Sequence, residues 1–386
     1  MEGESMSEWK EVKLEEILII YDKKRRPLSS IQRSSFQGQY RYYGAQGIID
    51  YIADYIFDGE YMLIAEDGEN LNSRTQPIAQ IVNGKFWVNN HAHIVRTNDK
   101  ANMYLVMLIL NNLNISSYVT GAAQPKLNQD NLKRISIYLP NKNEQDIIAG
   151  ILSSLDAKIE TNNKLNEKLE EMAQAIFKSW FVDFEPFKDK PFHETELGMI
   201  PEGWEVGSLS DIATITMGQS PCGTSYNENG EGIIFYQGRT EFGFRFPSIR
   251  LYTTAPSRFA EVGSTLMSVR APVGDINMAL LRCCIGRGVA SIKSNCDCDS
   301  YIYYLMKSLK KRFDIYNGEG TVFGSVGRDT LRGMLITIPP SSVISDFEMN
   351  ISKIDSRIKT NELESQRLAY LRDTLLPRLM SGELIV

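Results

Sequence analysis

The sequence predicts an α+β protein with an internal two-fold repeat, in which two globular domains of mixed strands and helices alternate with two long helices. The first observation is a repeated helical segment: LDAKIETNNKLNEKL (155–169) returns as IDSRIKTNELESQRL (354–368). The second is that each copy follows a stretch in which strand-like alternation and helical periodicity are interspersed without βαβ units. A repeat of this length determines the architecture.

The repeat extends beyond the helical segment. GAAQPKLNQDNLKRISIYLP (121–140) aligns with GTVFGSVGRDTLRGMLITIP (320–339), and EWKEVKLEEI (8–17) aligns with GWEVGSLSDI (203–212). Between these anchors the two copies diverge, which indicates one scaffold carrying two different recognition surfaces. The expected organisation is a disordered leader (1–8), domain 1 (9–140), helix 1 (141–182), a linker (183–203), domain 2 (204–340) and helix 2 (341–386).

Composition indicates a soluble globular protein, because 42% of the residues are hydrophobic and 23% are charged. Five cysteines without a secretory pattern favour a reducing cytoplasm and no disulfide framework. No apolar run approaches the ~18 residues that a membrane span requires, so we expect no membrane partner. The net charge of −6 argues only weakly against nucleic acid. Phosphate binding needs a local basic surface, and KKRRP (23–27) supplies one.

Within the domains, alternation of apolar and polar residues predicts half-buried strands at 210–217, 264–269, 288–294 and 334–339. Helical periodicity predicts helices at 102–113 and 300–313.

The two long helices show heptad patterns typical of a coiled coil. Position a is occupied by Ile148, Leu155, Asn162, Leu169 and Ile176 in helix 1, and by Phe347, Ile354, Asn361, Leu368 and Leu375 in helix 2. Position d is expected at Ile151, Leu165, Met172 and Leu371. Asn162 and Asn361 hold the same a position, where a buried asparagine fixes register at some cost in stability. The alternative is a surface-packed helix with solvated asparagines.

Chain geometry favours antiparallel pairing of the helices. Each domain precedes its own helix, and the short, proline-containing linker (183–203) can place domain 2 where an antiparallel second helix must begin. About 35 residues at ~1.5 Å rise make each helix roughly 50 Å long, and B-DNA repeats every ~34 Å. We therefore expect two domains, separated by the helices, that read a divided DNA target with an unread spacer.

Three segments make the chain resemble the DNA-specificity subunits of type I restriction–modification systems. They are SWFVDFEPF (179–187), ELGMIPEGWEVGSLSDI (196–212) and LLPRLMSGEL (375–384), and the alternation of domain and helix extends the resemblance over essentially the whole chain. The resemblance implies a subunit that binds double-stranded DNA and docks two methyltransferase subunits and, in the nuclease form, two motor–nuclease subunits. It also implies no cofactor in this chain, with S-adenosylmethionine, ATP and Mg²⁺ bound by the partners.

The residues agree with a non-catalytic role. The sequence has no G-x-x-x-x-G-K-[ST] phosphate loop and no Asn/Asp-Pro-Pro-aromatic motif of the kind that adenine methyltransferases carry. The nuclease-like DAK (156–158) becomes DSR (355–357) in the copy, so we interpret it as helix sequence. Two alternatives stay open: the specificity subunit of a type IIB fused nuclease–methyltransferase, and a coiled-coil adaptor without DNA recognition. The adaptor does not explain two diverged, arginine-bearing domains.

Domain 1 offers three segments of candidate DNA contacts, at 21–47, 72–76 and 89–93. Cations suit phosphates, and Arg, Gln and Asn can read base edges. The predicted contacts are Lys24, Arg25, Arg26, Arg33, Arg41, Tyr43, Gln46, Arg74, Gln76, Asn90 and His91. The alternative is a solvated surface loop, or structural hydrogen bonding for the histidines.

In domain 2, the segment 235–252 aligns loosely with the Tyr43–Gln46 region, and two further arginines lie near glycines that permit close approach. The predicted contacts are Gln237, Arg239, Arg245, Arg250, Arg270 and Arg287. The alternative is a turn with a surface arginine. No metal site is predicted, because the histidines at 91–93 have no acidic or cysteine cluster nearby. The cysteines at 283–284 and 296–298 also lack zinc-pair spacing.

Overall fold

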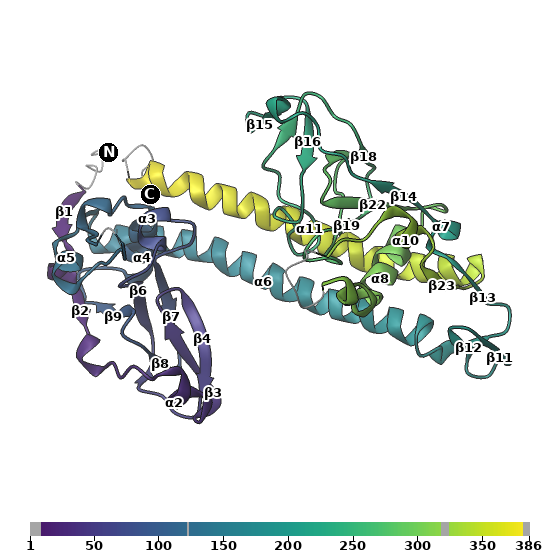
Figure 1. Ribbon diagram of the computed structural model, residues 1–386. Helices are drawn as coiled ribbons and strands as arrows, with labels where there is room; N and C mark the ends of the chain where they lie inside the picture. Colours follow the sequence, from purple (N-terminus) through teal and green to yellow (C-terminus); the bar gives the residue numbers. More distant parts are fainter. Residues whose placement is uncertain (1–8, 122, 318–323, 381–386) are drawn as a thin grey trace, which may run out of the picture. The chain divides into compact units, whose positions relative to one another are not determined.

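The computed structural model, shown in Figure 1, describes the chain over residues 9–121, 123–317 and 324–380. The leader expected at 1–8 and the end of helix 2 at 381–386 lie outside these residues. In the described part of the chain, no helix combines the length and the apolar character that crossing a membrane requires.

The chain divides into two compact units, one formed by residues 1–159 with 366–386 and the other by residues 160–365. Two long helices, α6 (Lys142–Phe181) and α11 (Ser341–Met380), contribute to both units. Each unit therefore contains one globular domain and part of each long helix.

Domain 1, in the first unit, consists mainly of two four-stranded sheets. The first sheet has the spatial order β2 (Leu18–Ile20), β9 (Ala92–Thr97), β6 (Tyr61–Ala65), β7 (Ala79–Val82). The second has the order β4 (Gly47–Ile52), β3 (Gln37–Gly44), β8 (Lys85–Val88), β5 (Phe57–Asp58). Neighbouring strands are antiparallel except β3 and β8, which are parallel. A separate antiparallel pair joins β1 (Lys10–Lys13) to β10 (Ser136–Leu139).

Five α-helices complete domain 1: α1 (Leu14–Ile17), α2 (Ser30–Ser34), α3 (Asn70–Ser73), α4 (Met103–Asn112) and α5 (Gln129–Arg134). Helix α4 is apolar along most of its length, and its Leu105 and Ile109 are fully buried. They share a hydrophobic core with Met62 of the first sheet and Leu152 of α6. The first sheet and α6 thus enclose α4.

Domain 2, in the second unit, is built in the same way. Its first sheet has the order β14 (Ala213–Met217), β22 (Val289–Ser294), β19 (Thr265–Ser268), β20 (Ile276–Met278). Its second has the order β15 (Tyr226–Asn227), β17 (Tyr252–Thr253), β16 (Ile233–Tyr236), β21 (Cys283–Ile285), β18 (Phe259–Ala260). The separate pair joins β13 (Glu205–Ser208) to β23 (Leu335–Ile338). The helices are α7 (Leu209–Ile212), α8 (Asp299–Ser308), α9 (Lys310–Asp314) and α10 (Arg328–Arg332).

The strand registers show that the sequence repeat is also a structural repeat. β3 pairs in parallel with β8 through Tyr43 and Val88, and β16 pairs in parallel with β21 through Tyr236 and Ile285. The order β2-β9-β6-β7 returns as β14-β22-β19-β20. The predicted mixed α+β fold is therefore confirmed, and the predicted strands appear as β14, β19, β22 and β23.

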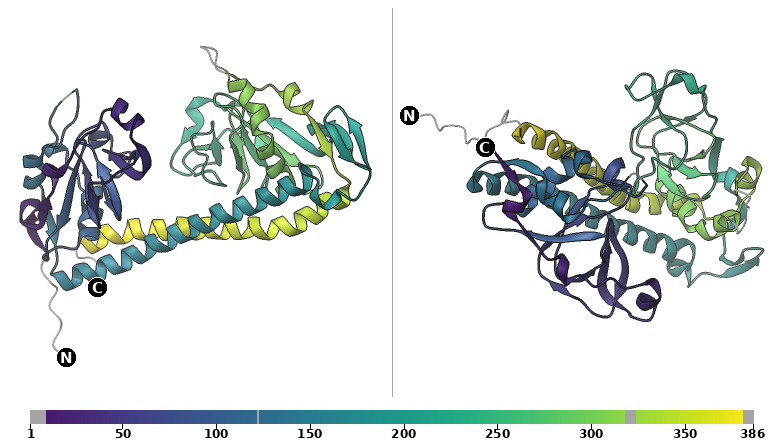
Figure 2. Two further views of the ribbon diagram at one scale, coloured as in Figure 1. Left: turned by 90° about the horizontal axis from the view of Figure 1, so that it is seen from below. Right: turned by 60° about the vertical axis from the view of Figure 1, so that its left-hand side comes forward.

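The long helices pair antiparallel within each unit (Figure 2). In the second unit the Phe177 and Phe347 rings lie 5.6 Å apart, while Asn162 near the start of its part of α6 contacts Asn361 near the end of its part of α11. In the first unit, Leu152 of α6 shares a core with Leu376 of α11.

The buried seam of α6 differs from the predicted one. The expected d residues are largely exposed, by 40%, 38% and 55% for Ile151, Leu165 and Met172. The e residues Leu152, Asn166 and Ala173 are buried instead, and Ile159 is partly buried. The physical reason is that α6 packs against α11 and also against a globular domain, so its buried stripe is displaced from a two-helix seam.

The segment predicted as a linker at 183–203 contains regular structure. Its residues form the hairpin β11 (Phe192–Thr195) and β12 (Gly198–Pro201). Phe187 and Ile200 are buried against Trp204 in the core of the second unit.

Candidate nucleic-acid interface

One edge of domain 2 gathers the ends of several strands. Val269, just after β19, donates its N–H to the carbonyl oxygen of Gly288 at 3.0 Å. Gly286, just after β21, donates to the carbonyl oxygen of Tyr236 at 2.8 Å. Since β14 and β19 both flank β22, and β16 runs parallel to β21, the loops after β14, β16, β19 and β21 meet at this edge.

Glycines allow these loops to approach so closely. A Cβ atom at Gly218 would lie 2.1 Å from the carbonyl oxygen of Gly286, and one at Gly286 would lie 2.9 Å from the backbone of Gln237. Five exposed side chains extend from the loops, and we call them the second recognition surface: Gln219, Gln237, Arg239, Arg270 and Arg287.

The arginines give this surface cationic, multidentate hydrogen-bond donors. Arg270 and Arg287 are exposed, and the Arg239 side chain is 51% exposed while it forms an ion pair with Asp275. An exposed ion pair contributes little to stability, so Arg239 can exchange this carboxylate for another acceptor at small cost.

Domain 1 builds the same edge with different side chains. Asn89 donates its N–H to the carbonyl oxygen of Tyr43 at 3.0 Å, just as Gly286 donates to Tyr236 in domain 2. Asp67 forms an isolated β-bridge with Lys126, and Arg270 forms the corresponding bridge with Ser325 in domain 2. Counting along the strands from these contacts pairs Gln46 with Arg239, Asp67 with Arg270, and Asn90 with Arg287. We call the domain 1 side chains, with the adjacent histidine, the first recognition surface: Gln46, Asp67, Asn90 and His91.

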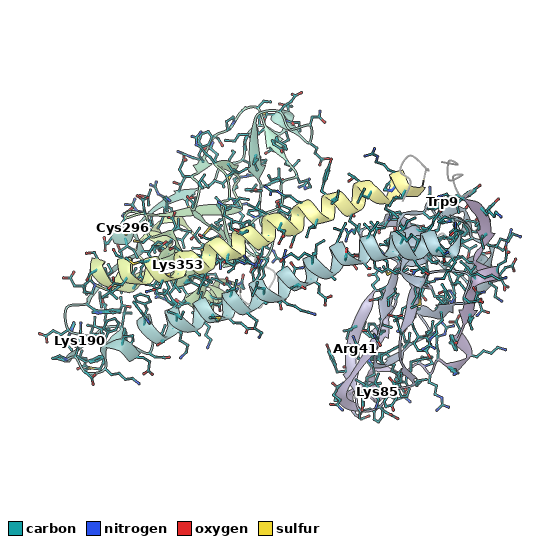
Figure 3. The ribbon with its side chains drawn as sticks, turned by 180° about the vertical axis from the view of Figure 1, so that it is seen from behind. Trp9, Arg41, Lys85, Lys190, Cys296 and Lys353 are labelled. Atoms are coloured by element: carbon teal, nitrogen blue, oxygen red, sulfur yellow. The ribbon has the colours of Figure 1, made fainter. Side chains whose placement is uncertain are left out.

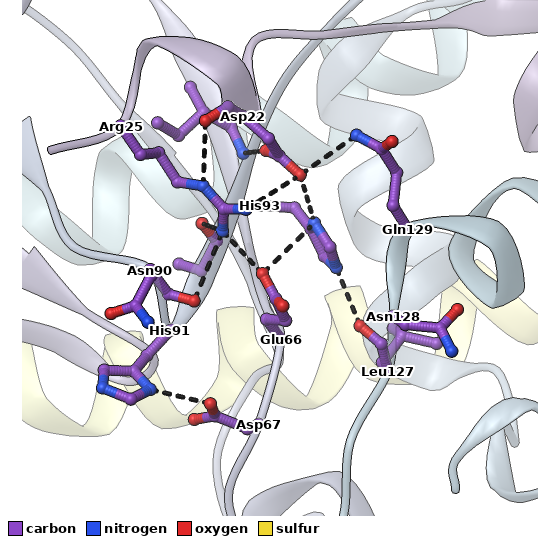
Figure 4. A network of polar contacts seen from close by, with 12 residues as sticks. Asp22, Arg25, Glu66, Asp67, Asn90, His91, His93, Leu127, Asn128 and Gln129 are labelled. Carbon is purple, nitrogen blue, oxygen red and sulfur yellow. Dashed lines mark hydrogen bonds and ion pairs between the residues drawn. The ribbon is translucent and has the colours of Figure 1, made fainter. Parts of the chain in front are cut away.

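An Asp–His pair distinguishes the first recognition surface (Figure 4). The His91 Nδ1 atom lies 2.7 Å from Asp67 Oδ2, and the His91 side chain is 46% exposed. The carboxylate engages Nδ1 and thereby orients the ring, which leaves Nε2 as the nitrogen for a ligand.

Beside this pair lies an ionic network that is buried at His93 and partly buried at Asp22 and Arg25 (Figure 4). His93 is 1% exposed, with Nδ1 at 2.6 Å from Asp22 and Nε2 at 2.8 Å from the carbonyl oxygen of Leu127. Both ring nitrogens therefore face oxygen atoms of the protein. Burial raises the pKa of the Asp22 carboxyl, but the hydrogen bond and charge of His93 and the charge of Arg25 outweigh it and lower the pKa.

Asp22, Glu66 and His93 are the one group among the described residues whose ligand atoms lie close enough to hold a metal ion. Protein cations already occupy that position, since Arg25 Nη1 is 2.5 Å and Lys126 Nζ is 3.3 Å from Glu66. We therefore interpret the network as structural. The prediction that the histidines lack acidic neighbours is wrong, because Asp22 and Glu66, from segments distant in the sequence, lie beside His93.

Domain 2 has no counterpart of this network among its described residues. The registers of β14, β19 and β22 place Met217, Val269 and Ala290 at the equivalent positions. All three belong to, or pack against, the hydrophobic core of the second unit. The cysteines of domain 2 are free thiols, of which Cys283 and Cys284 are buried.

Three predicted DNA contacts in domain 1 have structural roles instead. Arg25 is 16% exposed and is held by Glu66, so it is part of the buried network. Arg74 donates to carbonyl oxygens at the C-terminal end of α4, at 2.8 to 3.2 Å, and thereby caps that helix. Tyr43 is 3% exposed within a hydrophobic core. These three predictions are wrong, because Tyr43 is buried and the guanidinium groups of the partly buried Arg25 and Arg74 are engaged by acceptors of the domain itself.

The other candidates of domain 1 remain accessible to different degrees. Lys24, Arg26 and Gln76 are exposed. Arg33 is partly buried against Asp50 at 2.8 Å, and Arg41 donates to the carbonyl oxygen of Asn83. Figure 3 shows Arg41 and Lys85 at the same end of the domain, far from Trp9. They lie away from the first recognition surface, at the other end of β8 from Asn90.

In domain 2, the prediction for Arg245 is wrong, because its side chain is only 1% exposed. Of its two apolar neighbours, Phe246 is buried while Phe244 is exposed, so the flanking residues do not signal the burial of Arg245. Arg250 is 50% exposed but is held by Glu241 at 2.6 Å and Glu228 at 3.3 Å. It is therefore less available than Arg270 or Arg287.

Two residues of the recognition surfaces were missed from the sequence. Gln219 and Asp67 each stand two residues past the end of a strand, as Arg270 does. That shared position is a signal, but it becomes visible only once the strand ends are known.

The predicted register residues lie inside the helix pair of the second unit. Asn162 and Asn361 are each 1% exposed. Asn361 donates its amide to Asn166 Oδ1 at 2.8 Å, and Asn162 donates to Glu364 at 2.9 Å.

Comparisons with known proteins agree with this architecture. Residues 6–171 match the family model described as the type I restriction modification DNA specificity domain. A putative type I restriction enzyme specificity subunit of Methanocaldococcus jannaschii is 35% identical over 75% of this chain and 69% of its own length. A second putative specificity subunit, from Haemophilus influenzae, is 28% identical over 97% of this chain and 96% of its own.

Among solved structures, the S subunit of a type I restriction–modification system from M. genitalium has a TM-score of 0.66. It covers 98% of both chains at 14% identity, which shows a common fold. The relative from M. jannaschii, together with the family-model match, shows that the chain belongs to the family of type I restriction enzyme specificity subunits.

Proposed function

We propose that this chain binds double-stranded DNA at a bipartite target with an unread spacer. The observation that carries the proposal is the pair of recognition surfaces: one backbone frame presents Gln46, Asp67 and Asn90 in domain 1, and three arginines at the equivalent positions in domain 2. Equal frames with unequal side chains are what reading two different half-sites requires.

The chemistry of the surfaces suggests how each half-site is read. Arginines pair bidentately with guanine O6 and N7 in the major groove, which suits Arg270 and Arg287. Side-chain amides pair with adenine N6 and N7, which suits Gln46 and Asn90. The second half-site is therefore expected to contain guanine, and the first to depend on contacts to adenine.

We further propose that the long helices, which contribute to both units, set the spacer and dock two methyltransferase subunits and two motor–nuclease subunits. S-adenosylmethionine, ATP and Mg²⁺ would be bound by those partners, and the complex would act on DNA in the cytoplasm.

The test is to express the chain with the methyltransferase encoded beside it and to map N6-methyladenine across the host genome. A split motif with a fixed spacer and one modified adenine in each half supports the proposal. A continuous motif, or no new methylation with a demonstrably active methyltransferase, overturns it. An insertion of four residues after Thr161 then tests the spacer, because it should change the spacing or abolish activity without changing either half-site.

A further inference from the structure

Arg245 is buried although the segment that contains it borders the second recognition surface. The segment 237–250 begins with the exposed Gln237 and Arg239 and ends with the half-exposed Arg250. Between them the Arg245 side chain turns inward and is only 1% exposed. A charged group at such a position requires specific partners.

The partners of the Arg245 guanidinium come from three helices. Nη1 lies 2.8 Å from Asp355 of α11, and Nη2 forms an ion pair with Glu170 of α6. Nη2 also donates to the Tyr304 hydroxyl of α8 at 2.7 Å, and the guanidinium carbon lies 4.1 Å from the Tyr303 ring centre. One side chain therefore joins this segment of domain 2 to both long helices.

The backbone of the segment is held as well. The Arg245 N–H donates to Glu362 of α11 at 3.1 Å, and the Arg245 carbonyl oxygen accepts from Met278 of β20 at 2.9 Å. Ser248 donates to the carbonyl oxygen of Glu241 at 2.8 Å, which closes the loop around Arg245.

Charge balance makes Arg245 central to this cluster. Burial raises the pKa of the Glu170 carboxyl, but the charges of Arg245 and Lys307 outweigh it and lower the pKa. Lys307 Nζ lies 2.5 Å from Glu170. Removing Arg245 alone would leave Asp355 without its arginine in a partly buried site, which is far costlier than removing the whole charged group.

The repeat provides an internal contrast. Asp156 in the first unit is the sequence counterpart of Asp355, and it also accepts a tyrosine hydroxyl, that of Tyr104. Its arginine, however, is Arg372 at 2.6 Å, which comes from α11 and not from a loop of domain 1. Only in the second unit does the arginine at this aspartate belong to a segment bordering a recognition surface.

We propose that Arg245 is a positioning residue for the second half-site: it anchors the segment that carries Gln237 and Arg239 to the helix pair, so that reading by this surface depends on the helices. The inference rests on the proposed function. Beyond that function, it makes a buried side chain, which is not in contact with DNA, a determinant of specificity for one half-site only.

The test uses the complex with the methyltransferase and DNA duplexes altered at single bases of one half-site or the other. The decisive variant is R245M/E170Q/D355N, which removes the anchor together with the carboxylate charges it would otherwise strand. R245K is the conservative companion, since it keeps one charge but not the two-armed donor. The matched control is R372M/D156N, which makes the same change at the equivalent aspartate of the first unit.

For the triple variant, measured well below its melting temperature, we expect discrimination at the second half-site to fall at least tenfold. Discrimination at the first half-site should be unchanged. R245K should show a smaller loss in the same half-site, and the control should spare the second half-site. Wild-type discrimination at the second half-site in either folded Arg245 variant overturns the proposal. An equal loss at both half-sites also overturns it, because it would mean that Arg245 is only structural. Absence of a methylated motif with the wild-type chain would instead refute the proposed function.

Discussion

Asn361 of α11 donates its side-chain amide to Asn166 Oδ1 of α6 at 2.8 Å, and both side chains are almost fully buried. A direct hydrogen bond between two side-chain amides on different helices forms in only one register of the helix pair. In any other register two polar groups would be buried without partners, which costs free energy. The pair therefore selects one alignment of the two helices within the second unit.

The first prediction concerns this pair. Asn361→Leu should lower the free energy of unfolding by about 1–3 kcal/mol, because it leaves Asn166 buried without its donor. Asn166→Leu with Asn361→Leu should recover most of that loss, since two apolar groups replace the polar pair. Urea unfolding of the four members of the cycle measures both effects, and exposed Asn163→Leu serves as the control. Additive losses in the double variant would show that the two amides are not coupled.

The fold could be predicted largely because the repeat has sequence-local signals. The heptad-like apolar spacing of α6 and the anchors near Trp9 and Trp204 are readable from neighbouring residues. The buried stripe of α6 could not be read in this way, because Ile151 and Leu165 have the spacing of core positions in an isolated helix pair, yet both are exposed. Which stripe is buried depends on the domain that packs on the helix, and that contact is long-range.

The second prediction concerns Arg270. Arg270→Ala should weaken recognition of the second half-site by about 1–3 kcal/mol and relax the base preference there, as expected for loss of a bidentate base contact. Methylation rates on duplexes altered in one half-site at a time measure the effect. Arg282→Ala is the matched control, because Arg282 is also exposed but lies before β21, at the other end of that strand from the recognition surface. Equal weakening on every DNA sequence would assign Arg270 to a phosphate instead.

The third prediction concerns the Asp67–His91 pair. Asp67→Asn should reduce discrimination at the first half-site by about tenfold, roughly 1.4 kcal/mol, because the ring loses the carboxylate that orients it. His91→Ala should cause a loss at least as large in the same half-site. The combined variant should be no worse than His91→Ala alone, since Asp67 acts through the ring. Independent, additive losses would mean that Asp67 contacts DNA itself.

The candidate site was less predictable than the fold. Sequence reasoning chose arginines by type, but Arg245 finds Glu170 and Asp355, which are 75 and 110 positions away along the chain. Whether an arginine faces solvent or a buried carboxylate depends on such distant partners. Arg270 and Arg287 are exposed as expected, and the glycines beside them are a local signal of a loop.

The last prediction is a pH dependence of stability centred on Glu362, which accepts the Arg245 N–H. Burial raises the pKa of this carboxyl to about 7, and hydrogen bonds from the backbone offset the effect only in part. An unfolded glutamate titrates near pH 4.3, so the folded state holds the proton more tightly. The resulting stabilisation is complete below the unfolded pKa and is lost as the pH rises to about 7.

Wild-type protein should therefore unfold at progressively lower urea concentrations as the pH rises from 5 to 7. Glu362→Gln should flatten that slope, because glutamine resembles the protonated carboxyl at every pH. Glu167→Gln, an exposed change on α6, should leave the slope intact. The lowered pKa of Asp22 acts in a separate window, because its stabilisation is lost only as the pH falls below about 4. A slope that persists in Glu362→Gln would show that another group titrates between pH 5 and 7.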